Sequence, residues 1–403
     1  MSTSRASGAH ALVFGASGLI GWALVDELLK GYPENSTFSK VAALVNRPLN
    51  IENSYWPTPD RSRPELQLIS GINLASGTIE EFTEVMKEKV VGIEAVTHVY
   101  YFAYKQDDNS RVETAENAKM LERAMGALTA LYPKLEFIVI PSGSKGYGIH
   151  LETKPFKAPY TEDMILPNPN DSSIHYAAFQ HLLTEKSKGK QWTWCDVRPD
   201  AVVGFAPTGS TYNLTAHWAT YLSLYANIES AGSSVAFPGT ENAYNSLFNE
   251  ASSSIIARLA IWASLHPEVS ASQIINVADS AKAESMRDRW PKIASWFGLV
   301  GVGPASESSE APLLPSQYAH RHEKALKENG IGILIWKAEF LDSYGFYLDF
   351  DRQMSLEKCR RAGFEEEKDP NEGWFDAFEK FRGAGMILGQ WRRVLGFEQR
   401  WGF

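Results

Sequence analysis

Residues 10 to 29, HALVFGASGLIGWALVDELL, place a short β-rich run, three spaced glycines and a helix-compatible segment in direct succession. The glycines form a GxxGxxG motif where the expected strand passes into the expected helix. This spacing lets the backbone turn tightly and brings the helix N-terminus, with its free N–H groups, close to a pyrophosphate. A tight turn without a ligand is the alternative. The predicted nucleotide contacts in the motif are Gly15, Ser17, Gly18, Leu19, Ile20 and Gly21.

The alternation of strand-like and helix-like segments continues along the chain. Short β-rich runs are HALVF (10–14), KVAALVN (40–46), LQLIS (66–70), THVYYFA (97–103), EFIVI (136–140), WTWCDVR (192–198) and, much later, QIINVAD (273–279). Strands that alternate with helices form βαβ units with right-handed crossovers, and therefore a parallel sheet with helices on both faces. We predict a Rossmann-type, doubly wound α/β domain over residues 1–204, completed by about 241–280.

The remaining segments have a different character. Residues 205–240 and 281–403 are helix-compatible and rich in Trp and Phe, so we predict a smaller, mainly helical C-terminal lobe that binds substrate. The stretch SESSEAP (306–312) is the best candidate for a flexible surface loop. The aromatic C-terminal tail could cover the pocket or pack against a second subunit in a homodimer, and the sequence leaves both open.

Composition narrows the class of protein. The chain has 403 residues, 44% of them hydrophobic and 22% charged, and a formal net charge of -9, which disfavours nucleic-acid binding. Its two cysteines, Cys195 and Cys359, match neither a disulfide framework nor a zinc spacing, which favours a cytoplasmic location. The first ten residues have no apolar core, and no apolar run approaches eighteen residues, so no membrane association is expected. A small-molecule partner is therefore expected.

The end of the second strand bears on the choice of cofactor. NAD-binding proteins usually place an acidic residue there, whereas LVNRP offers Asn46 and Arg47. An arginine can bind a 2′-phosphate with two hydrogen bonds, which predicts NADPH or NADP as the cofactor; a solvated arginine is the alternative. By topology, Asn73 and Leu74 of the GINL segment would lie at the adenine.

Catalytic residues of this architecture are commonly a tyrosine and a lysine four apart on one helix, where both reach the same face. Among 16 tyrosines the spacing occurs once, at Tyr101 and Lys105. Tyr101 lies inside an expected strand, where residues four apart share no helical face, so we interpret this pair as a coincidence. A Tyr–Lys pair must then be assembled from separate segments. Metal catalysis has little support because the nine histidines show no HExxH-like spacing. Nucleophilic hydrolysis also has little support because no GxSxG motif follows an expected strand.

Several segments in succession resemble one family. They are SGSKGYG (142–148), PYTEDM (159–164), IHYAAFQHLL (174–183), WCDVRPDAVVGFAP (194–207), FPGTENAYNSLFNEASSSIIARLAIWAS (237–264) and INVAD (275–279). In this order they are similar to the plant progesterone 5β-reductase and iridoid synthase (PRISE-like) family of atypical short-chain dehydrogenases. The resemblance implies an extended short-chain fold, NADPH as cofactor, and reduction of the activated C=C bond of enones and enals in a small-molecule pathway.

The resemblance also implies site residues. Lys145 matches the family's loop lysine, Tyr147 the aromatic residue beside it, and Tyr176 the helix tyrosine. Four positions depart from the pattern. Ser142 stands in place of threonine, Gly146 in place of histidine, and Phe179 and Gln180 in place of the acidic pair after the tyrosine.

The chemistry of the pair follows general principles. Hydride addition to the β-carbon of an enone leaves an enolate, which a phenolic O–H near the carbonyl oxygen stabilises. Tyr176 is the candidate donor, and Lys145 could favour its phenolate form and also bind the cofactor ribose. Pro199 and Val202, at the end of the sixth strand, are expected beside the nicotinamide, and Arg198 is expected to anchor structure. Predicted liners of the substrate wall are Phe205, Tyr212, Trp336 and Phe350.

Two other functions stay open at this point. The same Tyr and Lys could protonate an alkoxide, as in a ketone or aldehyde reductase, and the product would be an allylic alcohol instead of a saturated carbonyl. A non-catalytic NADP(H)-sensing regulator is the other alternative, although a sensor has no need of an acid such as Tyr176.

Overall fold

A computed structural model describes residues 8–166, 174–208, 210, 212–305, 312–331 and 339–389. The chain divides into two compact units, and each is formed by three separate segments of the sequence. The first comprises Met1–Asp200, Ser253–Ala278 and Met354–Glu366, and the second Ala201–Ser252, Asp279–Gln353 and Glu367–Phe403. The binding roles expected of the two parts stay predictions.

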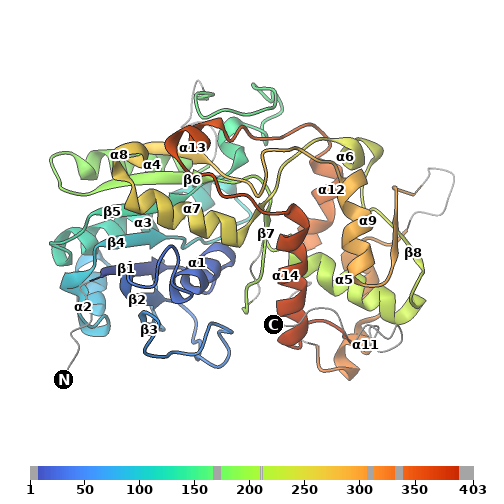
Figure 1. The fold of residues 1–403 in the computed structure, drawn as a ribbon, viewed down its shortest axis with the longest axis horizontal. Helices are drawn as coiled ribbons and strands as arrows, with labels where there is room; N and C mark the ends of the chain where they lie inside the picture. The colour runs from blue at the N-terminus through green and yellow to red at the C-terminus, as the bar shows by residue number, and fades with distance from the viewer. Residues whose placement is uncertain are drawn as a thin grey trace. The chain divides into compact units, whose positions relative to one another are not determined.

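The first unit is built on a seven-stranded sheet in which all neighbouring strands are parallel (Figure 1). Its order is β10-β6-β5-β4-β1-β2-β3. The strands are β1 (Ala9–Phe14), β2 (Phe38–Leu44), β3 (Glu65–Ile69), β4 (His98–Tyr101), β5 (Phe137–Pro141), β6 (Thr193–Arg198) and β10 (Gln273–Asn276). Each coincides with a run predicted from the sequence, so the doubly wound α/β prediction is confirmed. The strand order reverses beside β1, and sheets of this kind bind ligands at that point.

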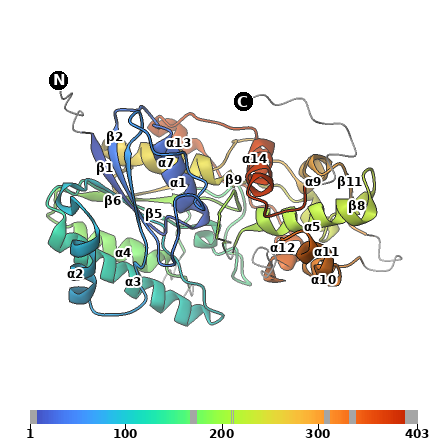
Figure 2. The same cartoon turned by 90° about the horizontal axis from the view of Figure 1, so that it is seen from below.

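Helices cover both faces of this sheet (Figure 2). The layer formed by α2, α3 and α4 lies on one face, and α1 and α7 pack together on the other. The helices of this unit are α1 (Leu19–Leu29), α2 (Ile79–Lys89), α3 (Ser110–Leu131), α4 (Tyr176–Ser187), α7 (Ser253–Leu265), α8 (Pro267–Ser270) and α13 (Glu357–Ala362). Local signals fix their starts: Thr78 and Glu81 form a capping box on α2, and the Asn109 side chain accepts N–H bonds at the start of α3.

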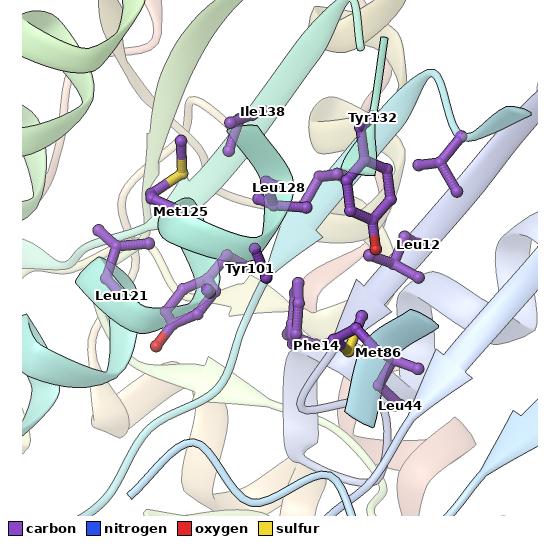
Figure 3. Close-up of a cluster of buried hydrophobic side chains, with 14 of the residues drawn as sticks. Leu12, Phe14, Leu44, Met86, Tyr101, Leu121, Met125, Leu128, Tyr132 and Ile138 are labelled. Atoms are coloured by element: carbon purple, nitrogen blue, oxygen red, sulfur yellow. The ribbon is translucent and has the colours of Figure 1, made fainter. Parts of the chain in front are cut away.

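The main hydrophobic core fills the space between the sheet and the α2–α4 layer (Figure 3). Because strand side chains alternate between faces, Leu12 and Phe14 of β1 point into this core together with Tyr101 of β4. The Tyr101 ring lies 5.7 Å from that of Phe14. Its hydroxyl is buried among apolar groups, and Lys105 pairs with Glu116 at 3.7 Å. The helix-like spacing of Tyr101 and Lys105 is therefore a coincidence, as predicted.

The second unit has a core of tryptophan and phenylalanine. Trp218 stacks on Trp374 with ring centroids 5.3 Å apart and planes 14° apart, and Trp290 meets Trp218 edge-on. Its helices are α5 (Leu214–Glu229), α6 (Glu241–Asn245), α9 (Met286–Trp296), α10 (Pro315–Arg321), α11 (Glu323–Glu328), α12 (Tyr344–Tyr347) and α14 (Pro370–Gly383). Short parallel pairs join β7 (Val202–Val203) to β9 (Ala251–Ser252) and β8 (Ser234–Ala236) to β11 (Val300–Val302).

Within the described ranges, no helix is both long enough and apolar enough to cross a membrane. The expected surface loop at 306–312 lies almost entirely outside the described residues, since only Pro312 of it is described.

Candidate active site

The glycine motif forms a tight turn between β1 and α1. Gly15 has φ +73°, and a Cβ there would lie 2.6 Å from the backbone carbonyl of Phe102 at the end of β4. A Cβ on Gly21 would lie 2.2 Å from the carbonyl oxygen of Gly15, so the first turn of α1 packs directly on the loop. Gly18 is the N-cap of α1, and no side chain caps the helix there. This cradle fits a pyrophosphate, because only backbone approaches it closely. Of the other predicted contacts, Leu19 is buried and Ser17 and Ile20 are half-buried.

Asn46 and Arg47 are exposed directly after β2, at the same edge of the sheet. The backbone N–H of Gly71 donates to the carbonyl of Asn46 at 3.1 Å, which holds the loop after β3 beside it. In that loop Asn73 is exposed, but its side chain bonds Ser76 and the N–H of Ala75, and Leu74 packs in the main core. Among the predicted cofactor residues at this edge of the sheet, Arg47 has an exposed cationic side chain.

The loop after β5 carries the candidate lysine. It forms one 3-10 turn, η2 (Ser144–Tyr147), in which Lys145 is exposed and Tyr147 is buried. Tyr176 is the first residue of α4, and its hydroxyl lies 3.0 Å from the point that a Cβ on Gly143 would occupy. The fold therefore brings together the two segments that the sequence separates by 31 positions. The glycine at 143 leaves room for the phenol, and Tyr176 is half-buried.

Below this loop lies a buried set of polar groups on β6. Asp196 is fully buried, and its carboxylate accepts hydrogen bonds from Ser142 Oγ at 2.5 Å and from Gln180 Nε2 at 2.6 Å. Arg198 Nε donates to Ser142 Oγ at 3.0 Å, and the guanidinium lies 4.8 Å from the centre of the Tyr147 ring. The expectation that Arg198 anchors structure agrees with these contacts.

Tyr147 and the strand β10 continue this polar set. The Tyr147 hydroxyl donates to Asn276 Oδ1 at 2.6 Å, and the Asn276 N–H donates to Glu162 at 2.9 Å. Burial raises the pKa of Glu162 above its usual value, and burial raises the pKa of Tyr147 to about 12. The Tyr147 hydroxyl is thus engaged with Asn276, and the raised pKa makes it a weaker acid than a free phenol.

A shallow cavity opens beside α4. Its lining includes the side chains of Tyr176, Gln180, Arg198 and Glu162, with apolar residues such as Ile274. The Tyr176 phenol, which is half-buried, and the buried Arg198 cation thus both line the cavity, and Gly146 of its lining follows the exposed Lys145 in the chain. Within the described part of the chain, no group of three or more His, Cys, Asp or Glu is placed to hold a metal.

A comparison with protein families agrees with this geometry. A family model described as a PRISE-like Rossmann-fold domain matches residues 11–388. The chain belongs to this family. Short chain dehydrogenase ausT of Aspergillus calidoustus is 33% identical over 395 residues, covering 94% of each chain. This PRISE-like protein is thus an oxidoreductase of the short-chain dehydrogenase/reductase type.

More distant relatives include an (S)-8-oxocitronellyl enol synthase of Nepeta cataria, 25% identical over 328 residues, covering 80% of this chain and 77% of that protein. Among solved structures, a GDP-mannoheptose C4 reductase of Campylobacter jejuni with NADP bound superimposes with a TM-score of 0.56 and 13% identity, covering 94% of this chain and all of that one. WbmF of Bordetella bronchiseptica in complex with NADH superimposes with a TM-score of 0.58 and 16% identity, covering 96% of this chain and 97% of that one. These two likenesses show that the PRISE-like chain has the fold of extended short-chain enzymes.

The remaining predicted residues of the PRISE-like chain fall in both units. Pro199 is buried in the first unit, and its carbonyl accepts the N–H of Ser144 at 3.0 Å, next to Lys145. The others are in the second unit. Val202 and Phe350 are half-buried, Phe205 is buried against Phe381, and Tyr212 is 40% exposed with its ring against Phe340. Trp336 lies outside the described residues. Phe205 thus packs in the core of the second unit, and its role as a pocket liner stays a prediction.

Sequence reasoning did not single out Asp196 or Asn276, which bond Ser142 and Tyr147 of the loop that carries the candidate lysine. A signal for Asp196 was present, because WTWCDVR places a carboxylate and an arginine two apart in a strand that must be buried. Charged residues are almost never fully buried unless they are paired, so this pattern predicts an ion pair. Asn276 carried no such signal, since a single asparagine after an apolar run also fits a turn.

His175 precedes the candidate tyrosine and is 8% exposed. Its ring lies 4.9 Å from that of Tyr176 and 4.7 Å from that of Phe179, and its Nδ1 has no hydrogen-bond partner. Burial, with a smaller effect of the Lys145 charge, lowers the pKa of His175 from 6.5 to about 4. Between these two pH values the unfolded chain binds more protons here than the folded chain, so stability falls as the pH is lowered from 6.5 toward 4.

We expect His175→Phe to reduce this acid sensitivity by up to about 3 kcal/mol, because phenylalanine fits the aromatic surroundings and binds no proton. The measurement is urea unfolding of both proteins at pH 7.5 and pH 4.5. Some sensitivity should remain, because burial also lowers the pKa of His98 to about 4. An equal loss of stability in the variant and the wild type would contradict the prediction.

Proposed function

We propose that this protein is an NADPH-dependent reductase that adds hydride across the C=C bond of an α,β-unsaturated carbonyl. The observation that supports it most is the approach of the Tyr176 hydroxyl to Gly143, on the loop that carries Lys145. The family supports the same class of reaction. The relative from Nepeta cataria is named an enol synthase, and an enol is the protonated form of the enolate that 1,4-reduction leaves.

The residues at the β1–α1 turn fit a dinucleotide, since Gly15 and Gly21 let the turn pack tightly against neighbouring backbone, and no side chain caps the N-terminus of α1 at Gly18. When bound, the nicotinamide cofactor supplies a hydride. Gly15, Ser17, Gly18, Leu19, Ile20 and Gly21 would hold the pyrophosphate, with Asn46, Arg47, Asn73 and Leu74 toward the adenosine and Pro199 and Val202 toward the nicotinamide. Lys145 would hold the ribose hydroxyls.

Tyr176 would act on the substrate carbonyl. As hydride reaches the β-carbon, negative charge develops on the carbonyl oxygen, and the phenol stabilises it by donating a hydrogen bond or its proton. The Lys145 ammonium favours the phenolate that proton transfer leaves. A proton on the α-carbon then completes the saturated carbonyl product. Charges that are paired inside the protein, such as Asp196 and Arg198, keep the site polar without adding a net charge.

The test is NADPH oxidation by purified protein against a panel of enals and enones, with products identified by mass spectrometry and NMR. A saturated carbonyl product, and loss of turnover in Lys145→Met and Tyr176→Phe, is the expected result. An allylic alcohol would identify a ketone or aldehyde reductase instead. NADPH binding without turnover of any carbonyl would contradict the proposal and favour a sensor.

Arg47 is proposed to select NADPH over NADH. Replacement by aspartate removes the partner of the 2′-phosphate and introduces repulsion, so we expect the Kd for NADPH to rise about 10- to 100-fold. The Kd for NADH, which has no such phosphate, should stay within about threefold. Titration of cofactor fluorescence measures both. A parallel loss for NADH and NADPH would show that Arg47 does not contact the phosphate, and Arg111→Asp, an exposed position at the start of α3, is the control.

A further inference from the structure

The carboxylate of Asp196 connects the two segments that carry the candidate catalytic residues. One oxygen accepts from Ser142, at the start of the loop that carries Lys145, and the other accepts from Gln180. Gln180 lies one helical turn after Tyr176 on α4, so the two side chains share a face of the helix. A single buried group on β6 therefore fixes both the loop and the helix.

Arg198 completes this connection. It lies two residues after Asp196 on the same strand, so both side chains point to the same face of the sheet. Its Nη2 lies 3.4 Å from Asp196 Oδ2, its Nε donates to Ser142, and it is 4% exposed. A fully buried carboxylate is stable only with a paired charge and hydrogen bonds. The planar guanidinium reaches Asp196 and Ser142 while it covers the Tyr147 ring, which a lysine could not do.

The absence of a side chain at Gly146 leaves space for the Arg198 guanidinium. A Cβ there would lie 2.8 Å from Arg198 Cζ and 3.0 Å from both of its terminal nitrogens. Gly146 has no positive φ, so its backbone conformation would accept alanine. The guanidinium is the obstacle, and a methyl group at 146 must displace it or the loop.

We propose that the Asp196–Arg198 pair is the positioning element that sets Lys145 against Tyr176, and that Gly146 is required because any side chain there would displace Arg198. The inference rests on the proposed function of Tyr176 and Lys145. Arg198 acts through the loop and the helix, so it is a positioning residue, and its loss should lower kcat while the KM for the carbonyl changes little.

The test is a double-mutant cycle of Gly146→Ala and Arg198→Met. Each single variant should lose about 100-fold in kcat, the loss expected from misplacement by about 1 Å, with KM within about threefold. If Gly146→Ala acts by displacing Arg198, the double variant should be no worse than Arg198→Met alone. Additive losses, or an unchanged kcat in Gly146→Ala, would overturn the proposal.

Matched variants separate positioning from general damage. Gly383→Ala, where a Cβ would meet nothing within 4 Å, should leave kcat unchanged. Arg198→Lys keeps the charge without the fork and should recover only part of the activity of Arg198→Met. If Arg198→Met does not fold, Gln180→Met, which removes only the link from Asp196 to α4, takes its place in the cycle, with the same loss in kcat expected.

Hydrogen exchange distinguishes failure of this inference from failure of the proposed function. In Gly146→Ala the amides of residues 142–148 should exchange at least about tenfold faster than in the wild type, because the loop loses its anchor. If the wild-type protein reduces no carbonyl, the proposed function is wrong, and the exchange rates alone then test whether Arg198 anchors the loop. If the wild-type protein reduces a carbonyl, and Gly146→Ala and Arg198→Met match it in kcat and in exchange rates, the proposed function stands and the positioning role is wrong.

Discussion

Tyr176→Phe is expected to lower turnover about 100- to 10,000-fold, the usual contribution of a positioned general acid. The structure predicts little other damage. The ring packs against His175 at 4.9 Å, and phenylalanine keeps this contact while it removes only the hydroxyl beside Gly143. NADPH should still bind with a Kd within about tenfold of the wild-type value, since the hydroxyl supplies at most one of many cofactor contacts. Stopped-flow turnover with an enone and fluorescence titration of NADPH measure the two effects.

The chain offers a matched control for this variant. Tyr101 has the sequence spacing of a catalytic Tyr–Lys pair, but its hydroxyl is buried in the main core without a hydrogen-bond partner. Tyr101→Phe should therefore turn over like the wild type. If Tyr176→Phe retained full activity, or if Tyr101→Phe lost it, the assignment of the acid would be wrong.

The second large effect is expected at Gly21. An alanine Cβ there would lie 2.2 Å from the Gly15 carbonyl oxygen, and both atoms belong to backbone that cannot rotate away. The first turn of α1 must move, at a cost of about 1–3 kcal/mol, which corresponds to a Tm lower by about 2 to 6 °C for a unit of this size. Because the same turn forms the cradle for the pyrophosphate, NADPH affinity should fall at least about tenfold.

Gly18→Ala is the comparison for this prediction. Gly18 has φ -79°, and its Cβ would lie 3.3 Å from the same oxygen, so a small adjustment suffices. Differential scanning fluorimetry should show a clearly smaller loss in Tm for Gly18→Ala than for Gly21→Ala. Equal losses at both positions would mean that close packing of α1 on the loop does not determine stability here.

Much of the first unit could be predicted from local sequence. The continuous apolar run of β1, whose residues 11–14 are all buried, and the glycines before α1 are local features with direct structural consequences. All seven strands followed from such patterns because buried parallel strands read as short apolar runs. The short strands of the second unit carried no such signal, since two-residue pairs such as β7 and β9 depend on tertiary contact alone.

The site was harder to predict from the sequence, as its departures from the family pattern show. Ser142, Gly146, Phe179 and Gln180 each weakened the resemblance when taken singly. In the structure three of the four meet one ion pair, and Phe179 packs in the main core. Ser142 and Gln180 bind Asp196, and Gly146 makes room for Arg198. Substitutions that meet at one buried charge pair cannot be interpreted one at a time, because the energy of a buried charge depends on all of its partners together.

The sequence by itself determined the doubly wound sheet, the position of the glycine turn and the exclusion of Tyr101, because each depends on residues within about one element of each other. Only the tertiary structure decided that the Tyr176 hydroxyl lies against the loop of Lys145, and that Asp196 holds both segments. These residues are brought together by parallel strands whose carboxyl ends meet at one edge of the sheet. The loop lysine and the helix tyrosine are 31 positions apart in the chain, and no local pattern in the sequence indicates that they are close, because their proximity depends on the packing of α4 against β6.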